Sequence, residues 1–286
     1  MQQTARHDQA PETEHELAHV LAVPAGRVGK PCDDAPVPSL PLVGIAGAAI
    51  GLLTGLFGVG GSSIATPVLS VLGAAPLAAI ASPLPATIPA AIAAAVPYVR
   101  KRENRPRAAI FTLIGGVPGT IAGALLSHVV AGQALLIGSG LVLVVLGARI
   151  GRPIEQSTRD AGTRRRTNRP ILVTASFGVG LFTGLLANGG GFLLVPMYVL
   201  VFGLRMRQAV ATSLTVIAVL AVPTLITHWA LGHIDWRVAA AFAVGAIPAA
   251  LVGGRFAQRF EGPQIRRAFG WFLMASGVAF VVYRLF

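Results

Sequence analysis

Apolar residues fill most of the chain in ten runs, separated by short polar or glycine-rich breaks. The runs cover 40–57, 61–73, 77–99, 108–131, 133–150, 171–187, 191–204, 208–231, 236–254 and 268–286. Because about 20 apolar residues are needed to cross a bilayer as a helix, most runs predict membrane-spanning helices. Two of them, 61–73 and 191–204, are too short to span comfortably. Run 77–99 contains four prolines, so its helix is expected to be kinked or broken. The pattern predicts an all-α polytopic membrane protein.

Each short run follows a glycine-rich break, and the two breaks repeat one another. Residues 51–67 and 180–196 are identical at eight of seventeen positions when offset by 129. Ordinary residue usage would match only about one or two of them by chance. The repeat continues at an offset of 130, where Gly73 corresponds to Gly203, Ala81 to Ala211, Gly115 to Gly245 and Pro118 to Pro248. Residues 40–150 and 171–286 are therefore predicted to be one membrane repeat used twice.

Polar segments precede and join the two repeats. Residues 1–39 hold three Lys and Arg against six Asp and Glu, and are predicted to form a polar disordered tail. Residues 151–170 are polar and basic and are predicted to form a linker. The single cysteine, Cys32, lies in the tail, so an intrachain disulfide framework is excluded.

Positive charge between the runs predicts how the repeats sit in the membrane. The basic segments are 100–107, 151–170, 205–207 and 255–267. Two other turns, 127–133 and 232–236, contain no Lys or Arg. Because loops rich in Lys and Arg stay in the cytoplasm, the basic segments are predicted to be cytoplasmic and the two turns external. We assign the net charge of +12 to this topology and not to a nucleic-acid partner.

This charge pattern makes each glycine-broken pair of runs a re-entrant helical hairpin. The pair 171–204 lies between two cytoplasmic segments, so it must enter and leave the membrane on one side. By repeat symmetry, 40–73 does the same from outside. Each repeat then has one hairpin plus three transmembrane helices, so the two repeats are inverted and both termini are external. If each pair instead crossed once, the repeats would run parallel and the charge pattern would be violated.

Inverted repeats with broken helices are typical of secondary transporters, which hold the substrate near the bilayer midplane. Helices that begin at the two glycine clusters would direct free backbone N–H groups at a shared site, and helix N-termini attract anions. Side chains nearby could add hydroxyl or amide donors. The candidate substrate-binding residues are Thr54, Gly60, Gly61, Ser62, Ser63, Thr183, Asn188, Gly189, Gly190, Gly191, Thr212 and Ser213.

Several of these residues have a second interpretation. Gly51 and Gly55 are better explained by close helix packing, whereas the glycine pairs beside the short runs favour a binding site. Ser82, Thr212 and Ser213 could face a cavity or bond carbonyl groups of their own helices.

Acidic residues and enzyme signatures are missing from the apolar runs. The absence of Asp and Glu there disfavours a cation substrate or a carboxylate proton relay. No Walker, HExxH or Gly-x-Ser-x-Gly motif occurs, so we expect neither an enzyme nor a bound cofactor or metal. His228 is explained better as an interfacial residue than as a proton carrier. The other expected interface anchors are Trp236, Trp271, Tyr98 and Tyr283.

The twin glycine segments, the two-fold repeat and the basic linker resemble the TauE/SafE family of sulfite exporters, also called DUF81 permeases. The segment from Gly180 to Pro196, followed by Thr212 and Ser213, is most similar to the family pattern. The resemblance covers 40–286 and implies transport of sulfite or an organosulfonate across the bacterial inner membrane. The first copy departs from the pattern with Ser62 and Ser63 in place of Gly191 and Phe192.

The sequence therefore predicts a secondary transporter, and by resemblance an exporter, of a small anion that works by alternating access. Its expected partners are the anionic substrate and the lipid bilayer. The alternatives are a passive anion channel and a membrane scaffold or sensor subunit whose glycines serve packing only. The oligomeric state stays open.

Overall fold

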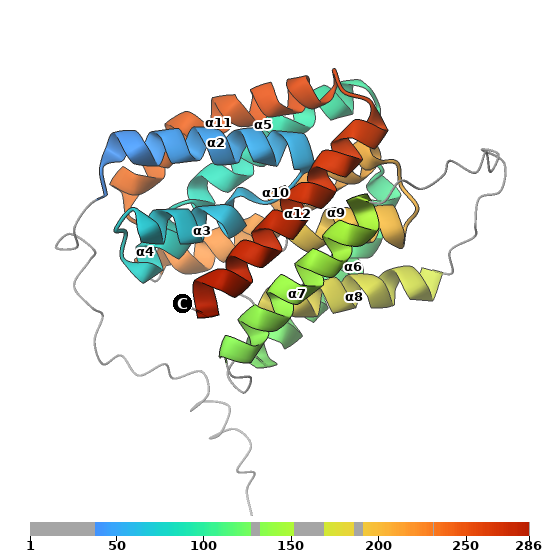
Figure 1. The fold of residues 1–286 in the computed structure, drawn as a ribbon, viewed down its shortest axis with the longest axis horizontal. Helices are drawn as coiled ribbons and strands as arrows, with labels where there is room; N and C mark the ends of the chain where they lie inside the picture. Colours follow the sequence, from blue (N-terminus) through green and yellow to red (C-terminus); the bar gives the residue numbers. More distant parts are fainter. Residues whose placement is uncertain (1–37, 127–131, 152–168, 186–190, 231, 286) are drawn as a thin grey trace, which may run out of the picture.

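A computed structural model of the protein describes residues 38–126, 132–151, 169–185, 191–230 and 232–285 (Figure 1). All regular secondary structure in these ranges is helical. The helices are α2 (Leu40–Phe57), α3 (Gly61–Val71), α4 (Pro76–Ala81), α5 (Leu84–Arg100), α6 (Pro106–Leu126), α7 (Gly132–Gly151), α8 (Arg169–Leu185), α9 (Gly191–Leu200), α10 (Met206–Ala230), α11 (Trp236–Ala257) and α12 (Gly262–Leu285). The predicted tail 1–39 and linker 151–170 fall almost wholly outside the described residues.

Glycine and proline place the helix ends close to where the apolar pattern predicts them. α2 ends where Gly58 adopts a left-handed backbone with φ of 67°. The Gly58 N–H donates to the Thr54 carbonyl over 2.8 Å, which closes the last turn. α3 begins directly after Gly60, and α9 begins at Gly191. The proline-rich run 77–99 is divided between α4 and α5, which confirms the predicted break.

The first described helix of each half, α2 or α8, packs against a helix of the other half. α2 lies along α11, and α8 lies along α6. A Cβ added to Gly51 would lie 2.8 Å from the Ala246 carbonyl carbon, and one on Gly180 would lie 2.8 Å from the Gly116 Cα. Both distances are too short for a side chain, so glycine is what lets these backbones touch. Gly55 meets α11 in the same way, which confirms close packing for Gly51 and Gly55.

The two interhelical contacts correspond to one another under the sequence repeat. At an offset of 129 Gly51 corresponds to Gly180, and at an offset of 130 Gly116 corresponds to Ala246. The same helix–helix contact therefore occurs twice: the first helix of each half packs against the fourth-run helix, α6 or α11, of the other half. Each half therefore needs the other half to cover the glycine face of its first helix.

α7 and α12, the last helices of the two halves, pack side by side in opposite directions. Arg266 Nε donates to the Ile150 carbonyl over 2.9 Å. A Cβ on Gly147, three residues earlier in α7, would lie 2.9 Å from Met274 Cγ, eight residues later in α12. Contacts closer to the start of α7 therefore involve residues closer to the end of α12, so the two helices are antiparallel. Figure 1 shows the two ribbons alongside each other.

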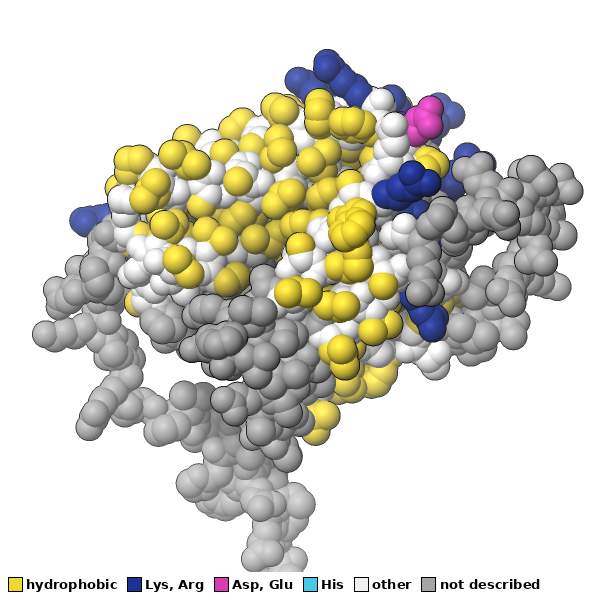
Figure 2. All heavy atoms as spheres, in the orientation of Figure 1, with side chains coloured by type: hydrophobic (Ala, Val, Ile, Leu, Met, Phe, Trp, Pro, Cys, Tyr) yellow, Lys and Arg dark blue, Asp and Glu magenta, His cyan; other side chains and the backbone are white. Residues whose placement is uncertain are grey.

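Apolar side chains cover much of the described surface. Figure 2 shows hydrophobic side chains spread over much of the described part of the visible face, with most of the visible Lys and Arg toward one end. Within the described ranges, four segments are long and apolar enough to cross a membrane: Leu40–Phe57, Ala78–Arg100, Met206–Ala230 and Trp236–Ala257. The polytopic helical prediction is confirmed to this extent. The first segment, which the charge pattern places in a re-entrant hairpin, has the length and composition of a spanning helix.

Candidate functional site

The glycine-rich starts of α3 and α9 lie against each other. A Cβ added to Gly191, the first residue of α9, would overlap the backbone N of Gly60 and lie 2.8 Å from its Cα. It would also lie 3.0 Å from the Val59 carbonyl carbon. Gly60 is the residue that precedes the first turn of α3. Two helix N-termini, one from each half of the chain, therefore meet with no room for a side chain between them.

The first N–H groups of each short helix have no carbonyl partner within the helix and carry partial positive charge. In α3 these groups begin at Gly61 and Ser62, both buried. The Ser62 carbonyl accepts a hydrogen bond from Thr66 Oγ1 over 3.0 Å. The Ser62 hydroxyl forms no hydrogen bond with the described residues. Ser62 thus offers both a backbone and a hydroxyl donor beside the contact with α9.

Thr54 and Gly61 lie together beside the bend between α2 and α3. Thr54 is 3% exposed, and its hydroxyl donates to the Ile50 carbonyl over 2.9 Å. A Cβ added to Gly61 would lie 3.5 Å from Thr54 Oγ1 and 3.5 Å from Ile50 Cγ2, which is ordinary van der Waals contact. The Thr54 hydroxyl is therefore bonded within its own helix, and position 61 has space for one methyl group.

Ser213 of α10 supports the bend between α2 and α3. Its Oγ lies 2.8 Å from the Gly58 carbonyl oxygen and 3.0 Å from the Val210 carbonyl oxygen. A Cβ added to Gly58 would lie 2.5 Å from Ser213 Oγ, so glycine is required there by space as well as by its left-handed backbone. The second half of the chain thus holds the hairpin bend of the first.

Thr212 and Ser82 form the same hydrogen bond in the two halves. Thr212 Oγ1 donates to the Gln208 carbonyl over 2.6 Å and accepts the Arg105 N–H over 3.2 Å. Ser82 Oγ accepts the Asp235 N–H over 3.1 Å. An offset of 130 relates Ser82 to Thr212 and Arg105 to Asp235. Each hydroxyl therefore binds the residue that precedes α6 or α11 of the opposite half.

The remaining candidate residues are not placed by the structure. Asn188, Gly189 and Gly190 lie outside the described residues, as do the side chains of Ser63 and Thr183. Among the residues that are described, no three His, Cys, Asp or Glu side chains cluster closely enough to hold a metal ion.

Two buried tyrosines, Tyr98 and Tyr198, are not among the candidate substrate-binding residues predicted from the sequence. Tyr98 is fully buried, and its hydroxyl donates to the Gly55 carbonyl over 2.9 Å. The prediction of Tyr98 as an interface anchor was therefore wrong, because the side chain bonds α2 instead of facing lipid. Tyr198 of α9 is also buried and donates to Thr112 Oγ1 over 2.8 Å. Trp271, by contrast, is 71% exposed, as an interface anchor should be.

A polar network at the basic end joins the α5–α6 loop to the second half of the chain. Glu103 forms an ion pair with Arg207 at 3.8 Å and accepts a hydrogen bond from Gln258 Nε2 over 3.0 Å. Asn104 Nδ2 donates to Thr215 Oγ1 over 3.2 Å. The sequence shows that Glu103 lies in the basic segment 100–107, but it does not indicate the partners of Glu103 or Asn104.

Comparison with known proteins agrees with the helical, apolar architecture. A family model described as "Sulfite exporter TauE/SafE" matches residues 43–280. A "Probable membrane transporter protein" of Xylella fastidiosa is 29% identical over 247 residues, covering 84% of this chain and 93% of the relative. The "Probable membrane transporter protein YunE" of Bacillus subtilis is 24% identical over 234 residues, covering 74% and 84%. No solved structure matches the chain.

The match to the family model extends over most of the chain, from the first turn of α2 into α12. It therefore includes both glycine-rich starts and the exchanged contacts that connect the two halves. The chain belongs to the TauE/SafE sulfite exporter family of membrane transporters.

Proposed function

We propose that the protein is a secondary transporter that moves a small anion by alternating access, with the meeting point of α3 and α9 as its binding site. The observation that carries this proposal is the contact between Gly60 and Gly191. Two helix N-termini at one place present unpaired N–H groups and the positive ends of two helix dipoles. An anion can be held there without a buried cationic side chain.

The antiparallel packing of α7 and α12 supports the inverted relation of the two repeats. Equivalent helices that pack in opposite directions are related by an axis perpendicular to them, and for spanning helices that axis lies in the membrane plane. The transport cycle is then a rocking of one set of helices against the other around a fixed site. The exchanged bonds of Thr212 with Arg105 and of Ser82 with Asp235 suit such a cycle, because they lie at equivalent places in the two halves.

The proposed substrate is sulfite or an organosulfonate, and the proposed direction is export. Both parts of this proposal draw on the family description and on the two N-termini that suit an oxyanion. The distribution of the basic segments supports a proposed orientation with the α5–α6 loop in the cytoplasm and both termini outside a bacterial inner membrane. The relatives named as probable membrane transporters agree with transport in general.

Counterflow into liposomes tests the proposal directly. Vesicles that contain the protein are loaded with unlabelled sulfite or sulfoacetate and diluted into labelled anion. A carrier is expected to accumulate label transiently above its equilibrium level. Equilibration without an overshoot would identify a channel. A folded protein that moves none of these anions, and that is not stabilised by them in a thermal-shift screen, would leave only the scaffold or sensor alternative.

Three glycine and serine variants test the location of the site. Gly61→Ala fits the available space, Gly61→Val adds bulk beside the helix start, and Ser62→Ala removes one hydroxyl donor. We expect progressive loss of transport from Gly61→Ala to Gly61→Val, and about tenfold weaker anion binding for Ser62→Ala, the size of one hydrogen bond to a charged group. Gly178→Ala is the matched control, because nothing lies within 4 Å of a Cβ at that position. Wild-type transport in all three test variants would show that the site lies elsewhere.

A further inference from the structure

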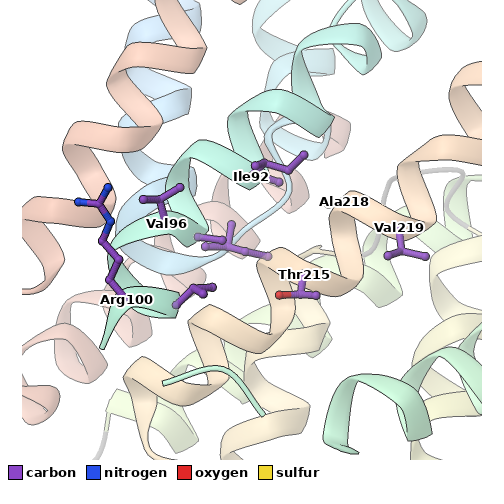
Figure 3. A pocket seen from close by; sticks show the side chains of 10 residues that line it. Ile92, Val96, Arg100, Thr215, Ala218 and Val219 are labelled. Atoms are coloured by element: carbon purple, nitrogen blue, oxygen red, sulfur yellow. The ribbon is translucent and has the colours of Figure 1, made fainter. Parts of the chain in front are cut away.

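A groove of about 410 Å³ runs between α5 and α10, away from the glycine contact. Its walls are aliphatic, with Ala91, Ile92 and Val96 on one side and Leu214, Ala218 and Val219 on the other. Figure 3 shows the labelled side chains of the two helices along the groove, with Arg100 at one end. Ile92 is 55% exposed and Val219 is 49% exposed, so the groove opens on the surface of two helices that are able to span a membrane.

Arg100, at the end of the groove, is the last residue of α5 and is exposed. Its guanidinium forms no ion pair or hydrogen bond with the described residues, unlike those of Arg207 and Arg266. The only acidic residue of the adjacent loop, Glu103, is already bonded to Arg207 and Gln258. Arg100 therefore supplies an uncompensated positive charge at the end of a spanning segment, the depth at which lipid phosphates lie.

We propose that this groove binds an anionic phospholipid, with one acyl chain along the aliphatic walls and the phosphate on Arg100. The groove volume falls within the roughly 300–1,000 Å³ of small-molecule sites. A small hydrophilic anion would gain nothing from the aliphatic walls. A zwitterionic lipid such as phosphatidylcholine also carries a phosphate, but its choline cation cancels that charge and would lie close to the Arg100 guanidinium, so its attraction to Arg100 is weaker than that of a lipid with a net negative charge. An anionic phospholipid provides both an acyl chain for the aliphatic walls and a negative charge for Arg100. The bilayer is its source.

The lipid would also contact the helix that holds the α5–α6 loop. Thr215 lines the groove and accepts the hydrogen bond from Asn104. A bound acyl chain packs against this turn of α10 and so stabilises the connection between the two halves. The inference is independent of the transported substrate, since none of the candidate substrate-binding residues lines the groove.

The test measures thermal unfolding of the delipidated full-length protein in detergent, with phosphatidylglycerol or phosphatidylcholine of the same acyl chains. We expect phosphatidylglycerol to raise the midpoint temperature by several degrees more than phosphatidylcholine, because a ligand of the native state stabilises it. Arg100→Gln is expected to abolish the difference and to weaken phosphatidylglycerol binding about fivefold, the effect of one basic residue at a membrane surface. Ala218→Leu narrows the groove and is expected to weaken the response to both lipids.

Lys101→Gln is the matched control, because Lys101 is an exposed neighbour that does not line the groove. It should keep the wild-type preference for phosphatidylglycerol. Equal losses in Arg100→Gln and Lys101→Gln would indicate diffuse attraction to the basic loop and overturn the proposal. The proposal also fails if inorganic phosphate alone gives the full stabilisation, or if the wild-type protein responds equally to both lipids. Since Arg100 is exposed, Arg100→Gln should fold even if Ala218→Leu does not.

Discussion

At the scale of single residues, glycine determines which surfaces of this protein can touch. Gly51 and Gly180 bring helix backbones into contact, and Gly191 does the same for two helix starts. Other glycines have no such role, since a Cβ at Gly178 or Gly262 would meet nothing within 4 Å. The number of glycines in a membrane protein sequence therefore does not show which of them are needed for close helix packing and which could be replaced by alanine. That distinction requires the atoms around each glycine to be known.

We predict that Gly51→Ala destabilises the protein, whereas Gly178→Ala does not. The new methyl group would overlap the Ala246 backbone, which cannot move as a flexible side chain would. Overpacking of this kind costs about 1–3 kcal/mol. Thermal unfolding of the two variants in detergent measures the difference. Equal stability would mean that α2 and α11 can separate without cost.

At the scale of helices, side-chain hydrogen bonds to carbonyl groups at helix ends join neighbouring helices, both within one half of the chain and between the halves. Tyr98 of α5 bonds the Gly55 carbonyl near the end of α2, and Ser213 of α10 bonds Gly58 just beyond it. These carbonyls lie where the helix can no longer supply an internal donor. The end of the first hairpin helix is thus held by one helix from each half.

Tyr98→Phe is predicted to lower the free energy of unfolding by about 0.5–1.5 kcal/mol, because it removes this one hydrogen bond and retains the ring. Thermal unfolding measures the loss, with Trp271→Phe as the control at an exposed position. If Tyr98 faced lipid, as the sequence alone indicated, both variants would behave alike. A larger loss in Tyr98→Phe supports its role in fixing the end of α2.

At the scale of the whole molecule, inversion makes a prediction about sidedness. The turns after α5 and α10 are equivalent: Arg102 and Gly232 both have positive φ, 55° and 67°. Inverted repeats place these turns on opposite faces of the membrane, and parallel repeats place them on the same face. Lys101→Cys and His233→Cys, each made with Cys32→Ser, report the face by labelling with an impermeant maleimide.

We expect His233→Cys to be labelled on intact cells, and Lys101→Cys only after the membrane is permeabilised. Labelling of both variants on intact cells would exclude inverted repeats. The reverse pattern would keep the inversion but overturn the orientation that the basic loops predict.

Much of this architecture could be predicted from the sequence, because apolar runs and glycine breaks act locally. The ends of α2 and the starts of α3 and α9 follow directly from them. The partners of Tyr98 and Glu103 could not be predicted, since they depend on which helices pack together in the folded chain. Thr212 illustrates the same limit: its bond to Gln208 is local, but its bond to Arg105 crosses between the halves.

The exchange of helices between the halves has a consequence for synthesis. α2 leaves the ribosome well before α11, to which its glycine face is complementary and which begins about 180 residues later. At about 5–20 residues per second, this first helix waits roughly 10–40 s for its partner. During that time the glycine face of α2 is exposed to lipid or to the insertion machinery. Biogenesis of this protein therefore includes a late rearrangement, in which a helix already delivered to the membrane packs against a helix made near the end of synthesis.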